Sequence, residues 1–322
     1  MTLGDEDNPY RISSVDDIEL IRKYPNSSFI LTDNINMENK GSLIKSSEFD
    51  KIDNFHGILD GNGKTIRNIK RGPLFNRNKG VIKNLSICNS LIEKHRGTTG
   101  TMVELNRGTI KSCFVSSRII SDYSAVGGVV GSNKKGVIKS TQSVCKIEGR
   151  NAVGGIAGEN IYGSIIGCCS NSEIEGESKV GGITGECFGI DENKIEKCSS
   201  SGSIKCEKSF VGGITGEADL PIIKCHSESD IFSYRTAGGL IGYNKSDLKD
   251  SYFHGKVEGQ PDGAIIGENR GEVTNVYSTK KSLNSSSSQN LIGRNIKLNR
   301  IIDITVKEDI DTIKRNLIAN EI

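Results

Sequence analysis

The sequence has no tryptophan, few aromatic residues and no long apolar run. Aromatic residues make up 5% of the 322 residues. Since aromatic rings are the usual platforms on which sugars stack, this scarcity counts against a polysaccharide-degrading enzyme. No segment approaches the roughly 18 consecutive apolar residues of a membrane span, so we expect no membrane insertion.

An excess of charge of one sign is also missing. The 42 Lys and Arg residues nearly balance 40 Asp and Glu residues, which leaves a formal net charge of +2. Binding to nucleic acid depends on neutralising many phosphates, and mimicry of nucleic acid needs a strong negative charge. The sequence therefore predicts no nucleic-acid partner.

The nine cysteines do not form the CxxC pairs of a zinc site, and their spacing follows the repeat described below. We expect free thiols. The polar start, "MTLGDEDNPYRI", is unlike a signal peptide. Both features are typical of a protein from a reducing compartment.

Glycine is abundant, with 38 residues, and much of it falls in one repeated motif. The clear copies are "AVGGVVGSN" (125–133), "AVGGIAGEN" (152–160), "KVGGITGEC" (179–187), "FVGGITGEA" (210–218), "TAGGLIGYN" (236–244) and "PDGAIIGEN" (261–269), with weaker copies in "RGPLFNRN", "TGTMVELN" and "QNLIGRN". The copies recur about every 27 residues. A phosphate-binding loop would occur once, so this period indicates a solenoid.

Each repeat also holds short apolar segments such as "IKSC" (110–113) and "IEKC" (195–198), bounded by Gly, Ser or Asn. Segments of this length are strands, and no helical period of 3.6 residues accompanies them. Three short strands per repeat predict an all-β, single-stranded parallel β-helix of about ten coils, whose equivalent residues stack about 4.8 Å apart.

Stacking also explains the recurring residue types. Gly154 and Gly155 are expected where a Cβ atom would clash or where φ must be positive. Asparagines end many copies, and stacked amides predict a hydrogen-bonded ladder. The members of this column are Asn133, Asn160, Asn244, Asn269 and Asn295.

Three regions are expected. Residues 1–50 form an N-terminal cap, with a helix in "SSVDDIELIRKY" that Ser14 and Asp17 begin and whose apolar face is Ile18, Ile21 and Tyr24. Residues 51–297 form the β-helix, and residues 298–322 form a C-terminal cap or interaction helix with Ile310, Ile313 and Leu317 on one face. One turn is longer than the others, and its segment 187–198 is expected to bulge outward.

A column of carboxylates is the first candidate for a binding site. Glu159, Glu186, Glu217 and Glu268 follow the third glycine of their copies, with Ser132 and Tyr243 interrupting the series. Carboxylates stacked at this spacing repel one another unless they are solvated or share a cation. We expect them to face water as a surface ladder, with a calcium ion or a cationic partner as the alternative.

A column of small residues is the second candidate. Cys113, Cys168, Cys198 and Cys225 recur at one position, which Thr141 and Ser251 also occupy. Zinc needs four ligands around one point, whereas these residues lie along a line. We expect buried thiols, with disulfides between rungs as the alternative, and we predict no metal, no cofactor and no catalytic residue.

The units "GGIAGEN" and "GGITGE", followed by "IxxC", resemble GLUG-motif repeat proteins, and "FHGILDGNGKTIRNI" is similar to the segment that often precedes those repeats. The resemblance covers roughly residues 50–295. It implies a right-handed parallel β-helix, usually in large surface or secreted microbial proteins that include adhesin-like chains. The family has no universal catalytic residue to transfer.

The combined features predict a non-catalytic structural or protein-interaction module, adhesin-like or part of an assembly, with a protein partner. The alternative is a polysaccharide-binding or polysaccharide-cleaving enzyme, a lyase or glycoside hydrolase, with a glycan as ligand. Such chemistry needs carboxylates that converge on one groove. Asp191 and Glu192 in the long turn, together with Glu186 and Glu217, are the candidates.

Overall fold

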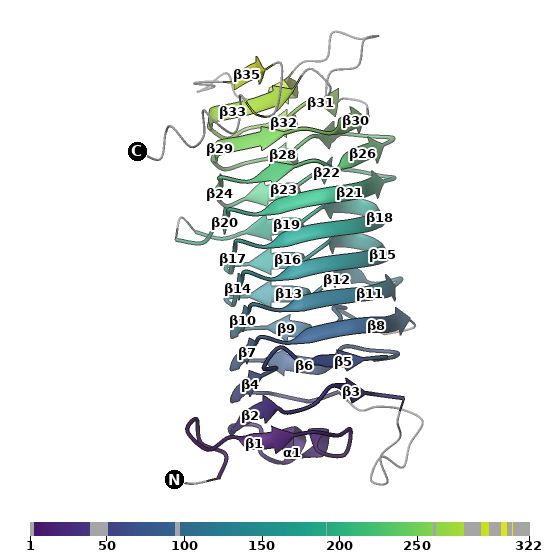
Figure 1. The fold of residues 1–322 in the computed structure, drawn as a ribbon. Helices are drawn as coiled ribbons and strands as arrows, with labels where there is room; N and C mark the ends of the chain where they lie inside the picture. The colour runs from purple at the N-terminus through teal and green to yellow at the C-terminus, as the bar shows by residue number, and fades with distance from the viewer. Residues whose placement is uncertain are drawn as a thin grey trace.

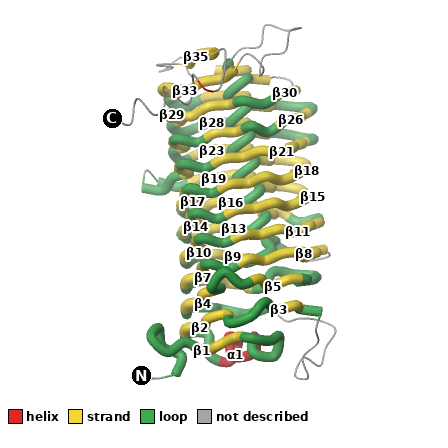
Figure 2. Tube along the Cα trace, viewed as in Figure 1, coloured by secondary structure: helices red, strands yellow, loops and turns green. Residues whose placement is uncertain are grey.

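A computed structural model describes residues 3–38, 51–93, 97–190, 192–259, 262–279, 291–295, 304–307 and residue 311. These residues form a parallel β-solenoid, an elongated stack of turns with one short helix at its N-terminal end (Figures 1 and 2). The second of its two sheets contains nine strands, one for each turn. The all-β parallel fold is thus confirmed, with about nine turns in place of about ten, and it is consistent with a right-handed β-helix.

One side of the stack consists of short strands, which we call the short ladder. Its parallel members are β1 (Tyr10–Ile12), β2 (Ser28–Leu31), β4 (Ile58–Asp60), β7 (Val81–Lys83), β10 (Thr109–Lys111), β14 (Val137–Lys139), β17 (Ser164–Ile166), β20 (Ile195–Glu196) and β24 (Ile222–Ile223).

The chain then turns into a second set of strands, the long ladder. Its members are β3 (Ile35–Asn36), β5 (Thr65–Arg67), β8 (Ser86–Glu93), β11 (Phe114–Ile120), β15 (Gln142–Gly154), β18 (Cys169–Gly181), β21 (Ser199–Cys206), β25 (His226–Ser227), β26 (Asp230–Ser233) and β30 (Lys256–Glu258). The strands β29 (Leu248–Phe253) and β33 (Val273–Thr279) run through both ladders. The ends of β15 and β18 form one parallel ladder with four short strands of other turns, in the order β12 (Ser124–Gly127), β15, β18, β22 (Val211–Gly212), β27 (Ala237–Gly238) and β31 (Asp262–Gly263).

The second sheet closes each turn. Its strands are β6 (Phe75–Asn78), β9 (Val103–Asn106), β13 (Val130–Lys134), β16 (Ala157–Ile161), β19 (Thr184–Phe188), β23 (Thr215–Asp219), β28 (Ile241–Asn244), β32 (Ile266–Asn269) and β34 (Ile292–Asn295). Ala157 pairs with Thr184, 27 residues on, whereas Thr184 pairs with Thr215, 31 residues on. The period read from the glycine motifs is therefore the turn length.

The helix α1 (Ile18–Lys23) lies at the N-terminal end of the stack, next to β1 (Figure 1). The Asp17 carboxylate accepts hydrogen bonds from the backbone N–H groups of Ser13 and Ser14, and Ser14 Oγ accepts one from the Asp17 N–H. This reciprocal pair begins the helix as expected. Ile18 and Ile21 are buried, so α1 covers the end of the core.

The parallel stack extends beyond the segment expected to form it. In the N-terminal 50 residues, β1 already pairs with β2, and β2 pairs with β4. Near the other end, β35 (Ile304–Lys307) pairs with β33. The rest of the expected C-terminal helix, including Ile310, Ile313 and Leu317, lies outside the described residues. Residues 280–290 also lie outside them.

The largely apolar interior holds buried Ser and Thr side chains and a ladder of amides. Each Nδ2 of Asn78, Asn106 and Asn133 donates to Oδ1 of the asparagine one turn further on, at 2.7–2.8 Å, and the ladder ends at Asn160. Asn244 donates in the same way to Asn269 at 2.9 Å. The members are fully buried. The expected ladder is confirmed for Asn133, Asn160, Asn244 and Asn269, while the side chain of Asn295 lies outside the described part of the chain. The gap in the ladder falls where Cys187 and Ala218 replace asparagine.

The paired glycines are required for close packing and not for an unusual backbone. A Cβ atom on Gly155 would lie 2.0 Å from Ser170 Oγ and 2.3 Å from the carbonyl oxygen of Gly182. Neither Gly154 nor Gly155 has a positive φ, so the first of the two expected reasons, the clash of a Cβ atom, is the one that applies. The positive φ falls two residues earlier, at Ala152, where it is 53°.

A second column of left-handed residues joins the short ladder to the long ladder. Asn84, Ser112, Ser140 and Gly167 have φ between 47° and 61°, and later turns repeat this conformation. A left-handed residue reverses the local bend of a strand, so the chain changes direction sharply there. The two ladders consequently meet at a corner that runs along the stack.

Candidate functional site

The predicted column of glutamates lies on successive strands of the second sheet. Glu159 of β16 pairs with Glu186 of β19, which pairs with Glu217 of β23. Tyr243 of β28 stands between Glu217 and Glu268. The structure therefore brings three of the four predicted residues together and places Glu268 apart.

These carboxylates do not form the expected solvated row. The side chains of Glu186 and Glu217 are only 16% and 15% exposed. Lys179 contacts the Glu186 carboxylate and places its Nζ 3.0 Å from Oε2 of Glu217, while Lys245 contacts the other oxygen of Glu217. An ammonium group between stacked carboxylates offsets their mutual repulsion, which is why the column is half-buried.

The first and third members of the column differ in acidity. Burial raises the pKa of Glu159, and the charge of Glu186 adds to this effect, although Ser132 donates a hydrogen bond to it. Burial also acts to raise the pKa of Glu217, but hydrogen bonds from Lys245 and Lys179 outweigh it, so this pKa lies below its ordinary value. Two carboxylates on either side of Glu186, two rungs apart, are thus shifted in opposite directions.

The group that joins these carboxylates is the Lys179 ammonium. Burial acts to lower the pKa of Lys179, but its hydrogen bonds to Glu186 and Glu217 raise it overall. Across the described ranges, no three His, Cys, Asp or Glu side chains are grouped to hold a metal ion. Glu268 has a looser partner, Arg294, whose Nη1 lies 3.9 Å from Oε1.

The long turn between β19 and β20 projects from the side of the stack, as expected for segment 187–198 (Figure 1). Its tip carries Ile190, which is 57% exposed, and the exposed Glu192. Asp191 lies outside the described residues. The rings of Tyr162 and Phe188 meet edge to face at the base of the bulge, with centroids 6.0 Å apart.

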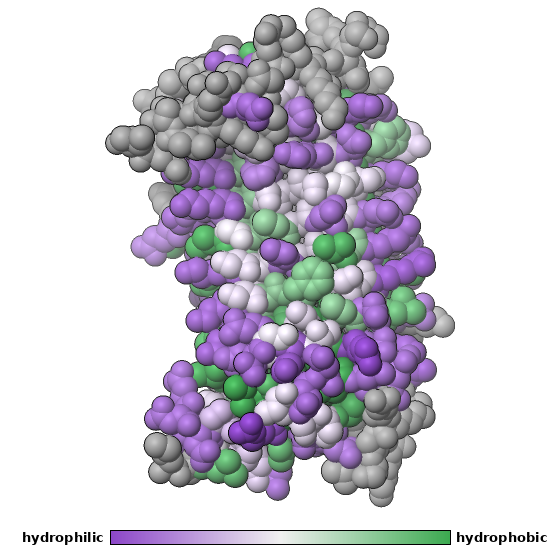
Figure 3. Space-filling view, viewed as in Figure 1, coloured by the Kyte–Doolittle hydropathy of each residue, from purple (hydrophilic) through white to green (hydrophobic). Residues whose placement is uncertain are grey.

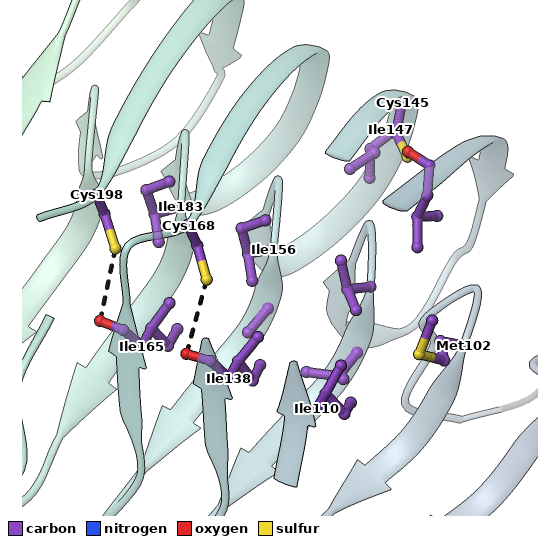
Figure 4. Packing of buried hydrophobic residues seen from close by; sticks show 14 of the residues in the cluster. Met102, Ile110, Ile138, Cys145, Ile147, Ile156, Ile165, Cys168, Ile183 and Cys198 are labelled. Carbon is purple, nitrogen blue, oxygen red and sulfur yellow. Dashed lines mark hydrogen bonds between the residues drawn. The ribbon is translucent and has the colours of Figure 1, made fainter. Parts of the chain in front are cut away.

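The cysteine column is an internal ladder of free, buried thiols, as predicted. Cys168 Sγ donates to the carbonyl oxygen of Ile138, and Cys198 Sγ to that of Ile165, in each case one turn below (Figure 4). Each thiol also donates to the carbonyl two residues before it. The Thr141 hydroxyl makes this second bond at 2.9 Å, which explains why Thr and Ser share the column.

Burial keeps the thiols of Cys113, Cys168 and Cys198 protonated. It raises the pKa of Cys113 to about 11. It also raises the pKa of Cys168 and Cys198 well above the ordinary value. Since the thiolate is the reactive form, this column is a structural element and not a nucleophilic or metal-binding one.

The outward surface of the long ladder carries a feature that the sequence analysis missed, which we call the uncharged strip. It consists of Phe114, Ser116, Gln142, Val144, Cys169, Asn171, Ser199 and Ser201. Val144 is 45% exposed and Cys169 is also exposed. Figure 3 shows paler and more apolar side chains along the middle of this face in the central turns. Outward residues alternate in "QSVCKIE" (142–148), and this alternation was the available signal.

Charged side chains border the strip on the side toward β12. Lys146 lies 3.2 Å from Glu173 one turn on, and Arg118 lies 3.5 Å from Glu148. Arg150 and Lys208 both pair with Glu177, at 3.5 and 2.6 Å. These ion pairs link successive turns along an exposed margin.

The fold and these columns define a parallel β-solenoid module. No family model matches the sequence, and no curated protein matches it. The similarity to GLUG-motif proteins therefore rests on the repeated sequence segments alone, and no family model shows membership.

Two solved structures are similar to the chain. One is a putative immunoglobulin A1 protease from Bacteroides ovatus, with 18% identity, a TM-score of 0.54, and coverage of 99% of this chain and 89% of that chain. The other is described as an IgA1 protease, with 16% identity, a TM-score of 0.48, and coverage of 87% of this chain but only 22% of that chain. At such identities the first likeness supports the β-helix fold alone. No described helix is long and apolar enough to cross a membrane.

Proposed function

We propose that the chain is a rigid, non-catalytic interaction module that presents the outer face of its long ladder to a protein partner or a larger assembly. The uncharged strip supports this proposal more than any other observation. Protein interfaces combine a core depleted in charged residues with a polar rim. The strip with its charged margin has this arrangement over four consecutive turns.

Rigidity is what such a module contributes. The buried asparagine ladder and the thiol ladder tie each turn to the next through side-chain hydrogen bonds. A surface held in one conformation loses little entropy on binding, so more of the contact energy remains as affinity. The resemblance to GLUG repeats, which occur in adhesin-like and surface proteins, is in keeping with this role.

Site-specific photo-crosslinking tests the proposal. A photoreactive amino acid in place of Val144, introduced into the chain in its native cells, is expected to capture one defined partner. The matched control is position 123, because Tyr123 is 43% exposed, close to the 45% of Val144, and lies outside the strip. The charged variant Val144→Glu should abolish the complex. Equal capture at both positions, or none at position 144, would reject the proposal.

Cleavage of a polysaccharide is the second candidate, and the glutamate column favours it. Glu159 with a raised pKa and Glu217 with a lowered pKa are suited to general acid and base roles. Glu186 separates these two residues, so they lie two rungs, or about 9.6 Å, apart, near the upper end of the carboxyl separation of an inverting mechanism. Turnover of any polysaccharide that Glu159→Gln and Glu217→Gln abolish, and Glu268→Gln spares, would establish this activity in place of the non-catalytic role.

A further inference from the structure

Three consecutive turns carry only positive charge where they pass through the short ladder. The segments 78–86, 106–114 and 133–142 contain two, two and three Lys or Arg residues, seven in all, and no Asp or Glu. The equivalent segment of the next turn, 160–169, has no charged residue. The overall charge of +2 therefore conceals a local basic surface.

The structure stacks these cations. Lys83 of β7 pairs with Lys111 of β10, which pairs with Lys139 of β14 (Figure 1). Equivalent residues on adjacent parallel strands are about 4.8 Å apart. Lys83 lies 3.2 Å from Asp60, at one end of the row. Lys111 and Lys139 are exposed and have no carboxylate within ion-pair distance in the described part of the chain.

A groove runs beside this lysine row, at the corner between the short and long ladders. Its volume is about 390 Å³, and the residues that line it include Asn84, Ser86, Ser112, Phe114, Ser140 and Gln142. The left-handed residues Asn84, Ser112 and Ser140 directly follow the three lysines in the chain. The same change of direction that separates the ladders thus places amide and hydroxyl groups next to the ammonium groups.

We propose that this groove and its lysine row bind an acidic polysaccharide, a glycan chain with carboxylate or sulfate groups. Stacked lysines without counter-ions repel one another, and an anionic ligand relieves this repulsion. The amides and hydroxyls can exchange hydrogen bonds with sugar hydroxyls, and the half-buried ring of Phe114 offers an apolar surface to a sugar ring. The inference goes beyond the proposed function, because it gives the groove a glycan ligand in addition to the protein partner of the uncharged strip.

The composition of the groove favours a glycan over other acidic polymers. Proteins that bind single-stranded nucleic acid stack successive bases on several aromatic rings, whereas Phe114 is the one aromatic residue that lines this groove. Cores of protein interfaces are depleted in lysine. Regularly spaced lysines beside small polar groups suit a ligand whose charges and hydroxyls repeat along an extended chain.

The test is calorimetric titration of the purified chain with oligogalacturonate, which carries carboxylates, and with heparin fragments, which also carry sulfates. Neutral dextran and single-stranded DNA complete the panel. Binding of at least one acidic glycan is expected, with affinity that falls as salt rises, because exposed charges are screened within roughly 10 Å at 0.1 M salt. The variant Lys111→Glu/Lys139→Glu should weaken this binding at least about tenfold, since it replaces attraction by repulsion at two adjacent positions.

Lys205→Glu/Lys256→Glu is the matched control, because it makes the same change in net charge at two exposed lysines of β21 and β30. It should leave the affinity within about twofold, as expected for charges separated from the ligand by more than a screening length. Lys111→Gln/Lys139→Gln replaces the glutamate variant if that variant does not fold. Phe114→Ala should weaken glycan binding as well.

Three outcomes would overturn the inference. They are no binding of either acidic glycan, equal losses in both charge-reversal variants, and tighter binding of DNA that depends on the same lysines. Recovery of the glycan at its original length keeps the non-catalytic function. Shortened glycan would reject that function and leave the binding inference in place, so the two failures are distinguishable.

Discussion

Lys179 Nζ lies 3.0 Å from Oε2 of Glu217, one turn further along the solenoid, and the same ammonium group contacts Glu186. A single cation therefore serves two stacked carboxylates. Because the sequence repeat places a glutamate at this position in successive turns, repulsion accumulates along the column unless a cation is inserted. The glutamate column is consequently a structural element in which lysine side chains neutralise the stacked carboxylates.

Removal of this lysine should destabilise the fold. Lys179→Met keeps an apolar stem but leaves the carboxylates of Glu186 and Glu217 half-buried with reduced compensation, and we expect a loss of about 1–3 kcal/mol in the free energy of unfolding. Urea unfolding measures it. The control is Lys146→Met, whose lysine is 53% exposed and pairs with Glu173 on the surface. That change should cost less than about 1 kcal/mol. Equal losses would contradict the structural role of Lys179.

Two isosteric substitutions in the column should act in opposite directions. The pKa of Glu159 is raised on folding, so its stabilising contribution is present below the unfolded pKa, near 4.5, and is lost as pH rises through the folded pKa. Glu159→Gln should therefore stabilise the chain at pH 7, by up to about 1 kcal/mol, and have little effect near pH 4.

The contribution of Glu217 to stability depends on pH in the opposite direction. Its folded pKa is lowered, so its contribution is present above the unfolded pKa and is lost as pH falls through the folded pKa. Glu217→Gln should destabilise the chain at pH 7, and the difference should shrink in acid. Melting temperatures of both variants between pH 3 and 8, a range that brackets the ordinary carboxylate pKa, measure this. Shifts of the same sign at pH 7 would be inconsistent with the structure.

Glycine substitutions should separate close packing from backbone strain. Gly155→Ala places a methyl group 2.0 Å from Ser170 Oγ, and we expect a loss above about 3 kcal/mol or failure to fold. Gly167 has a φ of 61°, but its nearest neighbour is 3.9 Å from the added carbon. Gly167→Ala should cost only about 1–2 kcal/mol, the penalty of a left-handed alanine. Thermal melts of the two variants check that Gly155→Ala loses more stability than Gly167→Ala. Similar losses would indicate that Gly155 is needed for its backbone conformation and not for close packing.

Thiol reactivity should follow burial. All nine cysteines are free, and Cys169 is the exposed one, so a thiol reagent at neutral pH should modify about one thiol rapidly in the native chain and all nine after denaturation. Cys169→Ser should remove the fast phase, while Cys168→Ser, one residue away but buried, should leave it. Protected thiols that become reactive only after reduction would mean that disulfides form.

The repeat period was enough to predict the solenoid because stacking requires equivalent residues at equivalent positions. The motif copies aligned Gly154 with Gly181, and the structure pairs these two residues. The asparagine ladder followed from the same alignment, since buried amides need hydrogen-bond partners and stacked asparagines provide them to one another. Cys168 and Thr141 were placed in one inward column, and their shared hydrogen bond to a carbonyl two residues earlier explains the exchange.

Other features depend on residues that share no repeat position. Lys179 offsets the negative charge of the glutamates from a position where other turns have Ala125 and Ala152. The repeat pattern therefore does not predict a lysine there. The lysine row of β7, β10 and β14 could be read from the sequence, but the net charge of the whole chain gives no indication of it. The corner groove depends on the left-handed φ of Ser112 and Ser140, and serine has no intrinsic preference for that conformation.

The turn that contains the lateral bulge is four residues longer than the one before it, yet Ile165 pairs with Ile195 and Ile195 with Ile222 on either side. The pairing of the strands above and below is therefore unaffected by the length of the loop between them. A foreign peptide inserted near Ile190 would be displayed at a constrained position on a stiff support. Lineages that carry this architecture can in the same way gain new loops without rebuilding their interior.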